Sequence, residues 1–196
     1  MILVALLACM APPTAADSSA HDAVSSLKAY ALFKSGDFDT ARDIWQRLAD
    51  KGNTTAMINL ANLFQQGMGV NEDQRKALEY VRRAAELGDG RAQYELGIEY
   101  EKGVLVERDI ERAAYWLQRS AEEDDMDGQF AYGILLATGR GMGPDTVTEP
   151  ERQQALYWLN RARANGHPDA GDYIRLLSKT QTQTHSPRGV PHENQH

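Results

Sequence analysis

The sequence predicts an all-α protein, a right-handed α/α superhelix (solenoid) of about four helix-hairpin repeats plus a C-terminal capping helix. The first observation is recurrence, because the segment 73–88 returns 36 residues later from Asp109 and again, after six added residues, before Gly166. The second is that each copy places a small residue, a large aromatic residue and another small residue on one helical face: Ala77/Tyr80/Ala84, Ala113/Trp116/Ser120 and Ala155/Trp158/Ala162. Self-similarity at a period of about 34–40 residues is typical of stacked helical repeats.

Length, charge and cysteine content limit the functions that are open. The 196 residues suffice for one sizeable core, and the composition, 42% hydrophobic and 25% charged, is that of an ordinary globular chain. A net charge of −7 gives no general attraction for nucleic acid or an anionic membrane. The single cysteine, Cys9, lies in the N-terminal apolar stretch, so no disulfide, thiolate metal site or cysteine nucleophile is expected in the repeats.

Residues 1–16 have the pattern of an export signal. The apolar run 2–11 is too short to span a bilayer as a helix, and the small residues up to Ala16 would suit a signal peptidase, although no Lys or Arg precedes the run. Alternatively, the segment 6–9 resembles a bacterial lipoprotein box in which Cys9 would be lipidated, and a third interpretation is an N-terminus without export. We expect an exported, periplasmic or secreted protein, whose only membrane contact would be a lipid on Cys9.

The remaining chain divides into a short polar spacer at 17–21, a repeat domain at 22–178 and a polar tail at 179–196 that we expect to be disordered. The first repeat carries residues at the spacings of a tetratricopeptide repeat: Ala29, Leu32, Gly36, Phe38, Ala41 and Trp45. Small residues are expected where its two helices approach closely, and Trp45 fills the space towards the next repeat.

The second, third and fourth repeats begin at Thr54, at Asp89 and near Asp127. Asp73 and Asp109 are predicted to cap the second helices of the second and third repeats. In the fourth repeat a longer loop rich in Gly and Pro, 139–148, precedes the second helix, which opens with a predicted capping box. One further helix, 168–178, has no partner helix after it and is predicted to cap the stack.

Two segments carry a family resemblance, AMINLANLFQQGMGVNEDQRKALEYVRRAAELG and AQYELGIEYEKGVLVERDIERAAYWLQRSAEED. They resemble the Sel-like repeat, a relative of the tetratricopeptide repeat, and the resemblance extends over about residues 22–178. The fourth copy departs in its long loop and at Arg163, where the pattern has an alanine. The resemblance implies an interaction scaffold or regulator without one fixed chemistry. Exported bacterial members are similar to adaptors in envelope signalling, secretion or host contact.

No catalytic or metal-binding constellation is predicted, and no cofactor is expected. The five histidines are scattered, three of them in the tail, and a solvated tail explains those better than weak metal binding. The acidic run 122–125 reads as a solvated turn, with a cation or a basic partner as the alternative. The glycine-rich segment 139–144 has no preceding strand and no Gly-Lys-Ser/Thr ending, so it is not a phosphate loop.

The concave face of such a stack is lined by the first helix of each repeat, and it is the predicted binding surface for a protein or peptide partner. An apolar, aromatic-lined groove with a few amides would suit an extended or helical peptide. Matching positions by spacing selects ten candidates: Tyr30, Phe33, Ile58, Asn62, Gln65, Tyr94, Ile98, Glu101, Phe130 and Ile134. The alternative, that the apolar members simply pack against neighbouring helices, remains open at this point.

Three functional hypotheses follow. The first is a non-enzymatic binding module, in which the concave groove receives a protein partner. The second is an enzyme acting on cell-wall material, for which Glu95, Glu99 and Glu101 are the only clustered acids on a first helix; the latter two lie about 200° apart around it and cannot act as a pair. The third is a structural spacer.

Overall fold

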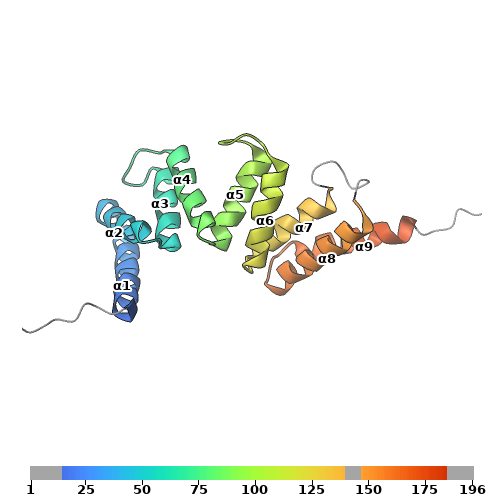
Figure 1. Cartoon of the computed structure of the whole chain (residues 1–196), viewed down its shortest axis with the longest axis horizontal. Helices are drawn as coiled ribbons and strands as arrows, with labels where there is room; N and C mark the ends of the chain where they lie inside the picture. Colours follow the sequence, from blue (N-terminus) through green and yellow to red (C-terminus); the bar gives the residue numbers. More distant parts are fainter. Residues whose placement is uncertain (1–14, 140–146, 185–196) are drawn as a thin grey trace, which may run out of the picture.

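The computed structural model describes residues 15–139 and 147–184, and these form nine α-helices in a curved row of antiparallel hairpins (Figure 1). The all-α architecture predicted from the repeats is confirmed. The helices are α1 (Ala15–Lys34), α2 (Phe38–Asp50), α3 (Thr54–Gln66), α4 (Gln74–Glu86), α5 (Gly90–Lys102), α6 (Ile110–Glu122), α7 (Met126–Ala137), α8 (Glu149–Ala164) and α9 (Ala170–Thr184).

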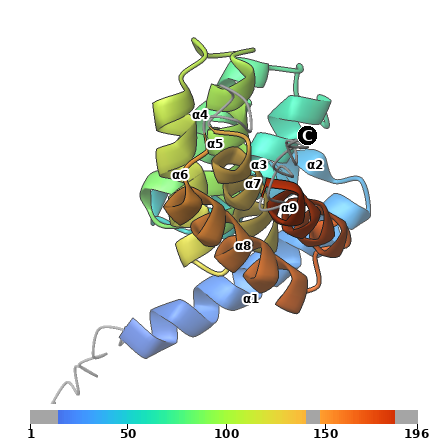
Figure 2. The same cartoon turned by 90° about the vertical axis from the view of Figure 1, so that its right-hand side faces the viewer.

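Each helix packs against the next in sequence, and α5 also packs directly against α7. The apolar faces form two clusters. The first extends from α1 to the start of α6, with Trp45, Leu60 and Leu96 in its interior, and the second joins α6, α7 and α8 around Leu117 and Leu136. Seen from the end of the row, α1 projects away from the body of the molecule (Figure 2).

Seven helices start at a side chain that accepts a hydrogen bond from the backbone of the first turn, which satisfies one of the free N–H groups there. The predicted caps Asp73 and Asp109 are confirmed, with oxygen-to-nitrogen distances of 2.9 and 3.0 Å. The predicted capping box is confirmed as well, since Thr148 and Glu151 bond reciprocally. The seven caps are Asp37, Asn53, Asp73, Asp89, Asp109, Asp125 and Thr148.

The structure differs from the predicted boundaries at both ends. Helix α1 begins at Ala15 and so includes the expected spacer 17–21, and α9 continues to Thr184, past the expected end at 178. Neither stretch contains Gly or Pro, so nothing in the local sequence stops a helix there. The apolar run with Cys9, the segment 140–146 of the long loop and the tail from 185 lie outside the described residues.

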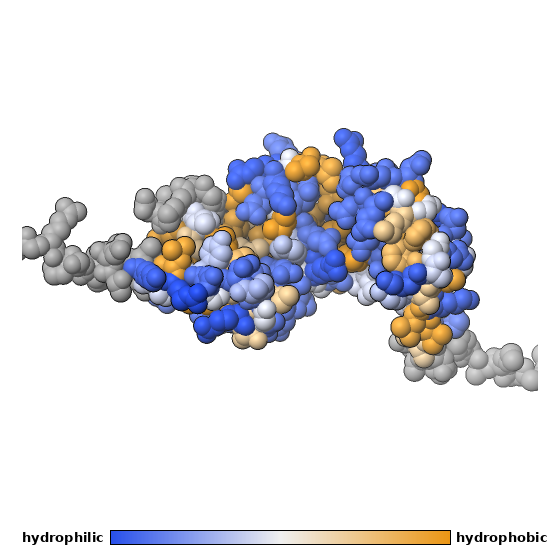
Figure 3. Space-filling view, turned by 180° about the vertical axis from the view of Figure 1, so that it is seen from behind, coloured by the Kyte–Doolittle hydropathy of each residue, from blue (hydrophilic) through white to orange (hydrophobic). Residues whose placement is uncertain are grey.

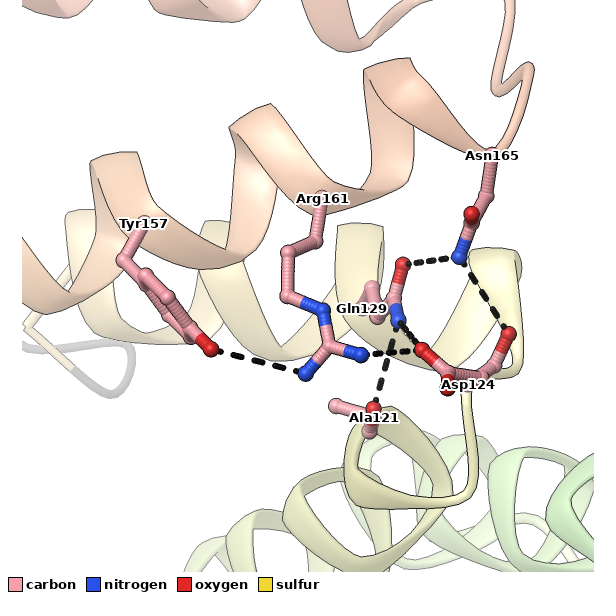
Figure 4. A network of polar contacts seen from close by, with 6 residues as sticks. All are labelled: Ala121, Asp124, Gln129, Tyr157, Arg161 and Asn165. Carbon is pink, nitrogen blue, oxygen red and sulfur yellow. Dashed lines mark hydrogen bonds and ion pairs between the residues drawn. The ribbon is translucent and has the colours of Figure 1, made fainter.

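The turn between α6 and α7 joins the third repeat to the fourth through a polar network (Figure 4). The Asp124 carboxylate pairs with Arg161 of α8 and accepts a hydrogen bond from Nε2 of buried Gln129 at 3.1 Å. Gln129 also donates to the Ala121 carbonyl at 3.3 Å and accepts from Nδ2 of Asn165 at 3.0 Å. The acidic run is largely exposed, as predicted for a solvated turn, and its member Asp124 also pairs with an arginine of its own chain.

Asp124 also has an unusual backbone conformation, with φ of 63°, at a turn position where the other repeats have glycine. Gly52, Gly88 and Gly166 have φ values of 89°, 93° and 96°. A left-handed conformation costs about 1 kcal/mol or more for a residue with a Cβ atom, and aspartate tolerates it better than most. Aspartate is therefore used here because its carboxylate forms contacts that glycine lacks.

We expect Asp124→Ala to lower the free energy of unfolding by about 1.5 kcal/mol, because alanine keeps the backbone strain and loses the contacts with Arg161 and Gln129. Asp124→Gly loses the same contacts but removes the strain, so its cost should be about half as large. Urea denaturation of the two variants beside the wild type measures both values. Equal costs would show that the backbone conformation contributes nothing.

Candidate functional site

A cleft of about 260 Å³ lies between α3 and α5, with α4 as its floor, and it brings together four of the ten residues selected from the sequence. Asn62 and Gln65 come from α3, and Tyr94 and Ile98 come from α5. The full lining is Ala61, Asn62, Gln65, Gln74, Ala77, Leu78, Val81, Arg91, Tyr94, Glu95, Ile98, Glu99 and Leu105. Four of the ten predicted residues therefore lie in one groove within the second and third repeats.

Small side chains leave room for the cleft. Ala61 of α3 and Ala77 of α4 line it and leave the space between the longer side chains unfilled. Helix α5 packs directly against α7, but no pairing of that strength joins α3 to α5, or α1 to α3, among the described helices. Elsewhere, on the face seen in Figure 3, apolar residues gather in small groups between hydrophilic ones.

The polar side chains of the cleft have unused hydrogen-bonding capacity. Within residues 15–139 and 147–184, no hydrogen bond is made by the side chains of Asn62 and Gln65 or by the Tyr94 hydroxyl. The only bond at Gln65 is made by its backbone carbonyl, which accepts from Nε2 of Gln74 at 3.1 Å. Two amides and a phenol are therefore available to a bound molecule.

The charges around Tyr94 are mainly negative. Burial raises the pKa of the Tyr94 hydroxyl, and the carboxylates of Asp127, Asp125, Glu95 and Glu101 raise it further. The phenol is therefore neutral and a hydrogen-bond donor at physiological pH.

The carboxylates that line the cleft itself have partners within it. Glu95 pairs with Arg91 at 3.1 Å, and Glu99 accepts a hydrogen bond from the backbone amide of Leu105. These contacts occupy one oxygen of each carboxylate and leave the other oxygen without a partner among the described residues.

The other predicted residues lie away from the cleft. Tyr30 is exposed on α1, and Phe33 packs against Phe38 and Trp45 with ring centroids 5.5 and 5.6 Å apart. Ile58 is 7% exposed and belongs to the first core cluster. Phe33 and Ile58 therefore pack between helices, whereas Tyr30 is exposed.

Further along the row, Phe130 and Ile134 of α7 and Glu101 of α5 are half-buried. The Phe130 ring stacks on the His167 ring at 3.8 Å and meets Tyr173 edge-on at 5.3 Å, which fastens α9 to α7. The backbone carbonyl of Glu101 accepts a hydrogen bond from Arg108 at 3.0 Å. The 36-residue ladder Ile58, Tyr94 and Phe130 therefore does not form one continuous surface.

Sequence reasoning missed the part of the cleft that comes from α4 and from the loop after α5. Leu78 and Val81 of α4 and Leu105 of that loop line it beside the predicted residues. The prediction was restricted to the first helices, which line the concave face of such a stack. Val81 also belongs to the first core cluster, so its apolar spacing along α4 fits core packing as well as it fits a cleft wall.

In the part of the chain that the structure describes, no group of three or more His, Cys, Asp or Glu side chains is arranged to hold a metal ion. None of the helices in that part is both long and apolar enough to cross a bilayer.

Comparison with known proteins agrees with the fold. The sequence matches the Sel1 repeat over residues 54–89, 90–125 and 127–167, and no curated protein matches the chain. A Sel1 repeat protein from Oxalobacter formigenes is 28% identical, with a TM-score of 0.64 over 70% of this chain and 38% of that one.

Two further solved structures share the fold at lower identity. A protective antigen of uropathogenic Escherichia coli strains is 21% identical, with a TM-score of 0.67 over 84% of this chain and 36% of that one. An immunity protein from Pseudomonas aeruginosa is 22% identical, with a TM-score of 0.53 over 86% of this chain and 62% of that one. This chain thus spans less than two thirds of the length of each.

The family match begins at residue 54, so the first hairpin, which has tetratricopeptide spacing, lies outside it. The three matched segments correspond to the hairpins α3–α4, α5–α6 and α7–α8, and together they cover more than half of the chain. On this match, and on the row of hairpins that the structure shows, the chain belongs to the Sel1 repeat family.

Proposed function

We propose that this protein is a non-enzymatic binding module that receives a short segment of another protein in the α3–α5 cleft. The observation that carries the proposal is the combination of apolar walls with open hydrogen-bonding groups. Asn62, Gln65 and Tyr94 offer donors and acceptors that have no partner among the described residues. Within the described part of the chain, these groups form no internal hydrogen bond that would stabilise the fold, so they can bond to a ligand in place of water.

A peptide segment suits the dimensions and chemistry of the cleft. Each peptide bond presents one N–H and one C=O group, and a side-chain amide can bind both. The apolar side chains of Leu78, Val81 and Ile98 supply the contact for an apolar side chain of the ligand. A cleft of about 260 Å³ accommodates a few side chains, so the complex requires an extended segment that continues along the groove.

We place this binding function in the bacterial cell envelope, as an interaction scaffold or regulatory adaptor. The support is the export-like pattern of residues 1–16, with a lipid anchor on Cys9 as the alternative. Likenesses to an antigen and an immunity protein are likenesses of fold, and they are compatible with several partners.

Affinity capture from envelope extract tests the cleft. We expect a protein captured by the wild type to be lost at least tenfold with Tyr94→Ala/Ile98→Asp, because a charge replaces the apolar wall. Circular dichroism must show that this variant is folded, since both residues also pack against the second core cluster. The variant Asn62→Ala/Gln65→Ala removes the open amides without removing an internal hydrogen bond of the described residues, and it should weaken capture as well.

The matched control is Tyr115→Ala/Leu87→Asp, which makes the same changes at exposed positions outside the cleft. It should capture the partner as the wild type does. Equal capture by the wild type and both cleft variants would show that the cleft is not the binding surface.

A further inference from the structure

We propose that the segment bound in the α3–α5 cleft carries a lysine or arginine side chain beside an apolar one, and that Glu95 and Glu99 hold the cation. This inference rests on the proposed function, and it specifies the chemistry of the partner. Glu95 and Glu99 are four residues apart on α5, so their carboxylates lie on the same side of the helix and face the cleft together.

The charge of the whole neighbourhood favours a cation. Helix α3 carries no charged residue, so the opposite wall of the cleft offers no competing arginine or lysine. Arg91 is the one cation among the lining residues, and it is paired with Glu95 at the end of the cleft. Beyond Tyr94, the half-buried Glu101 and Asp127 add further negative charge.

The basic residues of this region lie elsewhere. Arg82 and Arg83 are exposed on α4, and neither lines the cleft. Arg83 instead bonds to the Ala49 carbonyl at 3.4 Å and lies over the Tyr80 ring. An acidic segment would therefore meet repulsion in the cleft, whereas a basic segment would find complementary charge next to apolar walls.

One basic segment could bind to the carboxylates of the cleft and also to the amides that lack a hydrogen-bond partner among the described residues. A lysine or arginine side chain has a long apolar stem, which can lie on Ile98 and Leu105 while its head reaches a carboxylate. The Tyr94 ring presents an additional surface for a cation. The Asn62 and Gln65 amides on the opposite wall remain for the backbone of the same segment.

A double-mutant cycle between protein and peptide tests the inference. Peptides of twelve residues are selected from a display library on the full wild-type chain, synthesised, and measured by fluorescence anisotropy at low and physiological salt. We expect the selected peptides to share a lysine or arginine at a fixed number of residues from an apolar residue. Replacing that cation by glutamine should weaken binding about tenfold, and so should Glu95→Gln/Glu99→Gln. When the altered peptide is measured with the altered protein, the affinity should be little lower than with either change alone.

The control Glu79→Gln/Glu86→Gln removes the same charge from exposed positions of α4 outside the cleft, and it should leave the affinity unchanged. Two outcomes would overturn the inference and leave the proposed function standing. In the first, the selected peptides lack a cation but lose binding with Asn62→Ala/Gln65→Ala. In the second, the losses in the double-mutant cycle are additive. Failure to select any peptide, or binding unaffected by both cleft variants, would overturn the two together.

Discussion

Gly128→Ala is expected to lower the free energy of unfolding by about 3 kcal/mol, although alanine is the better helix former by about 1 kcal/mol. Gly128 lies in the first turn of α7, where it touches Ser120 of α6. A Cβ atom at this position would overlap the Ser120 hydroxyl and would lie 2.6 Å from Ser120 Cβ and 3.1 Å from its backbone carbon. Because backbone lies behind the contact, the two helices would have to separate.

The neighbouring repeat shows how the clash can be relieved. The residues 36 positions earlier are Ala84 and Ala92, both fully buried, so that repeat uses two alanines where this one uses serine and glycine. The Ser120 hydroxyl is buried and has no hydrogen-bond partner among the described residues, so Ser120→Ala should cost nothing or stabilise slightly. We therefore expect Ser120→Ala to restore only part of the stability lost in Gly128→Ala, because the Cβ atom of residue 120 would still lie 2.6 Å from the new one.

Urea denaturation of the two single variants and the double variant measures this coupling. Gly171→Ala is the matched control, because a Cβ atom on this glycine of α9 would find its nearest neighbours at 3.9 Å, and alanine should stabilise the helix there. If Gly128→Ala were as stable as the wild type, the close approach of α6 and α7 would not be required.

Leu117→Ala is expected to lower the free energy of unfolding by about 3–4 kcal/mol, because it leaves a cavity in the centre of the row. Leu117 of α6 is fully buried, and its side chain covers Gly97 of α5. A Cβ atom on Gly97 would lie 2.8 Å from both Cγ and Cδ2 of Leu117, so the leucine fills the space that the glycine leaves. Chemical denaturation, with circular dichroism at 222 nm, measures the loss.

The second repeat again provides the comparison, since Ala61 and Val81 occupy the positions of Gly97 and Leu117. There a larger residue on the first helix faces a smaller one on the second. We expect Gly97→Ala to destabilise the protein by clashing with Leu117, and Leu117→Val to relieve that clash when the two are combined. Additive losses in the double variant would contradict this exchange of volume between the two positions.

The repeats and their boundaries could be predicted because they depend on local chemistry. Asp73 and Asp109 precede each second helix at the same spacing, and a carboxylate in that place accepts a hydrogen bond from the first turn whatever surrounds it. Likewise, Tyr80 and Trp158, which are the aromatic residues of one recurring helical face, are both buried.

The cleft could be predicted only in part, because its shape depends on distances between hairpins. Spacing along α3 and α5 selected Asn62, Gln65, Tyr94 and Ile98, but it equally selected Ile58 and Phe130, which helix packing uses. Periodicity indicates the helical face on which a residue lies, but it gives no information about the distance between one hairpin and the next. That gap is set by contacts such as those between α5 and α7.

The same uneven contact has a mechanical consequence. Helix α5 is braced against α7 on one side and faces the open cleft on the other, so resistance to bending is not uniform along the row. Among the described helices, no direct pairing of that strength joins α3 to α5 or α1 to α3, so we expect the row to bend more easily before α5 than between α5 and α7. A segment bound in the cleft would act as a wedge between α3 and α5, and it would thereby restrict bending between the hairpins on either side.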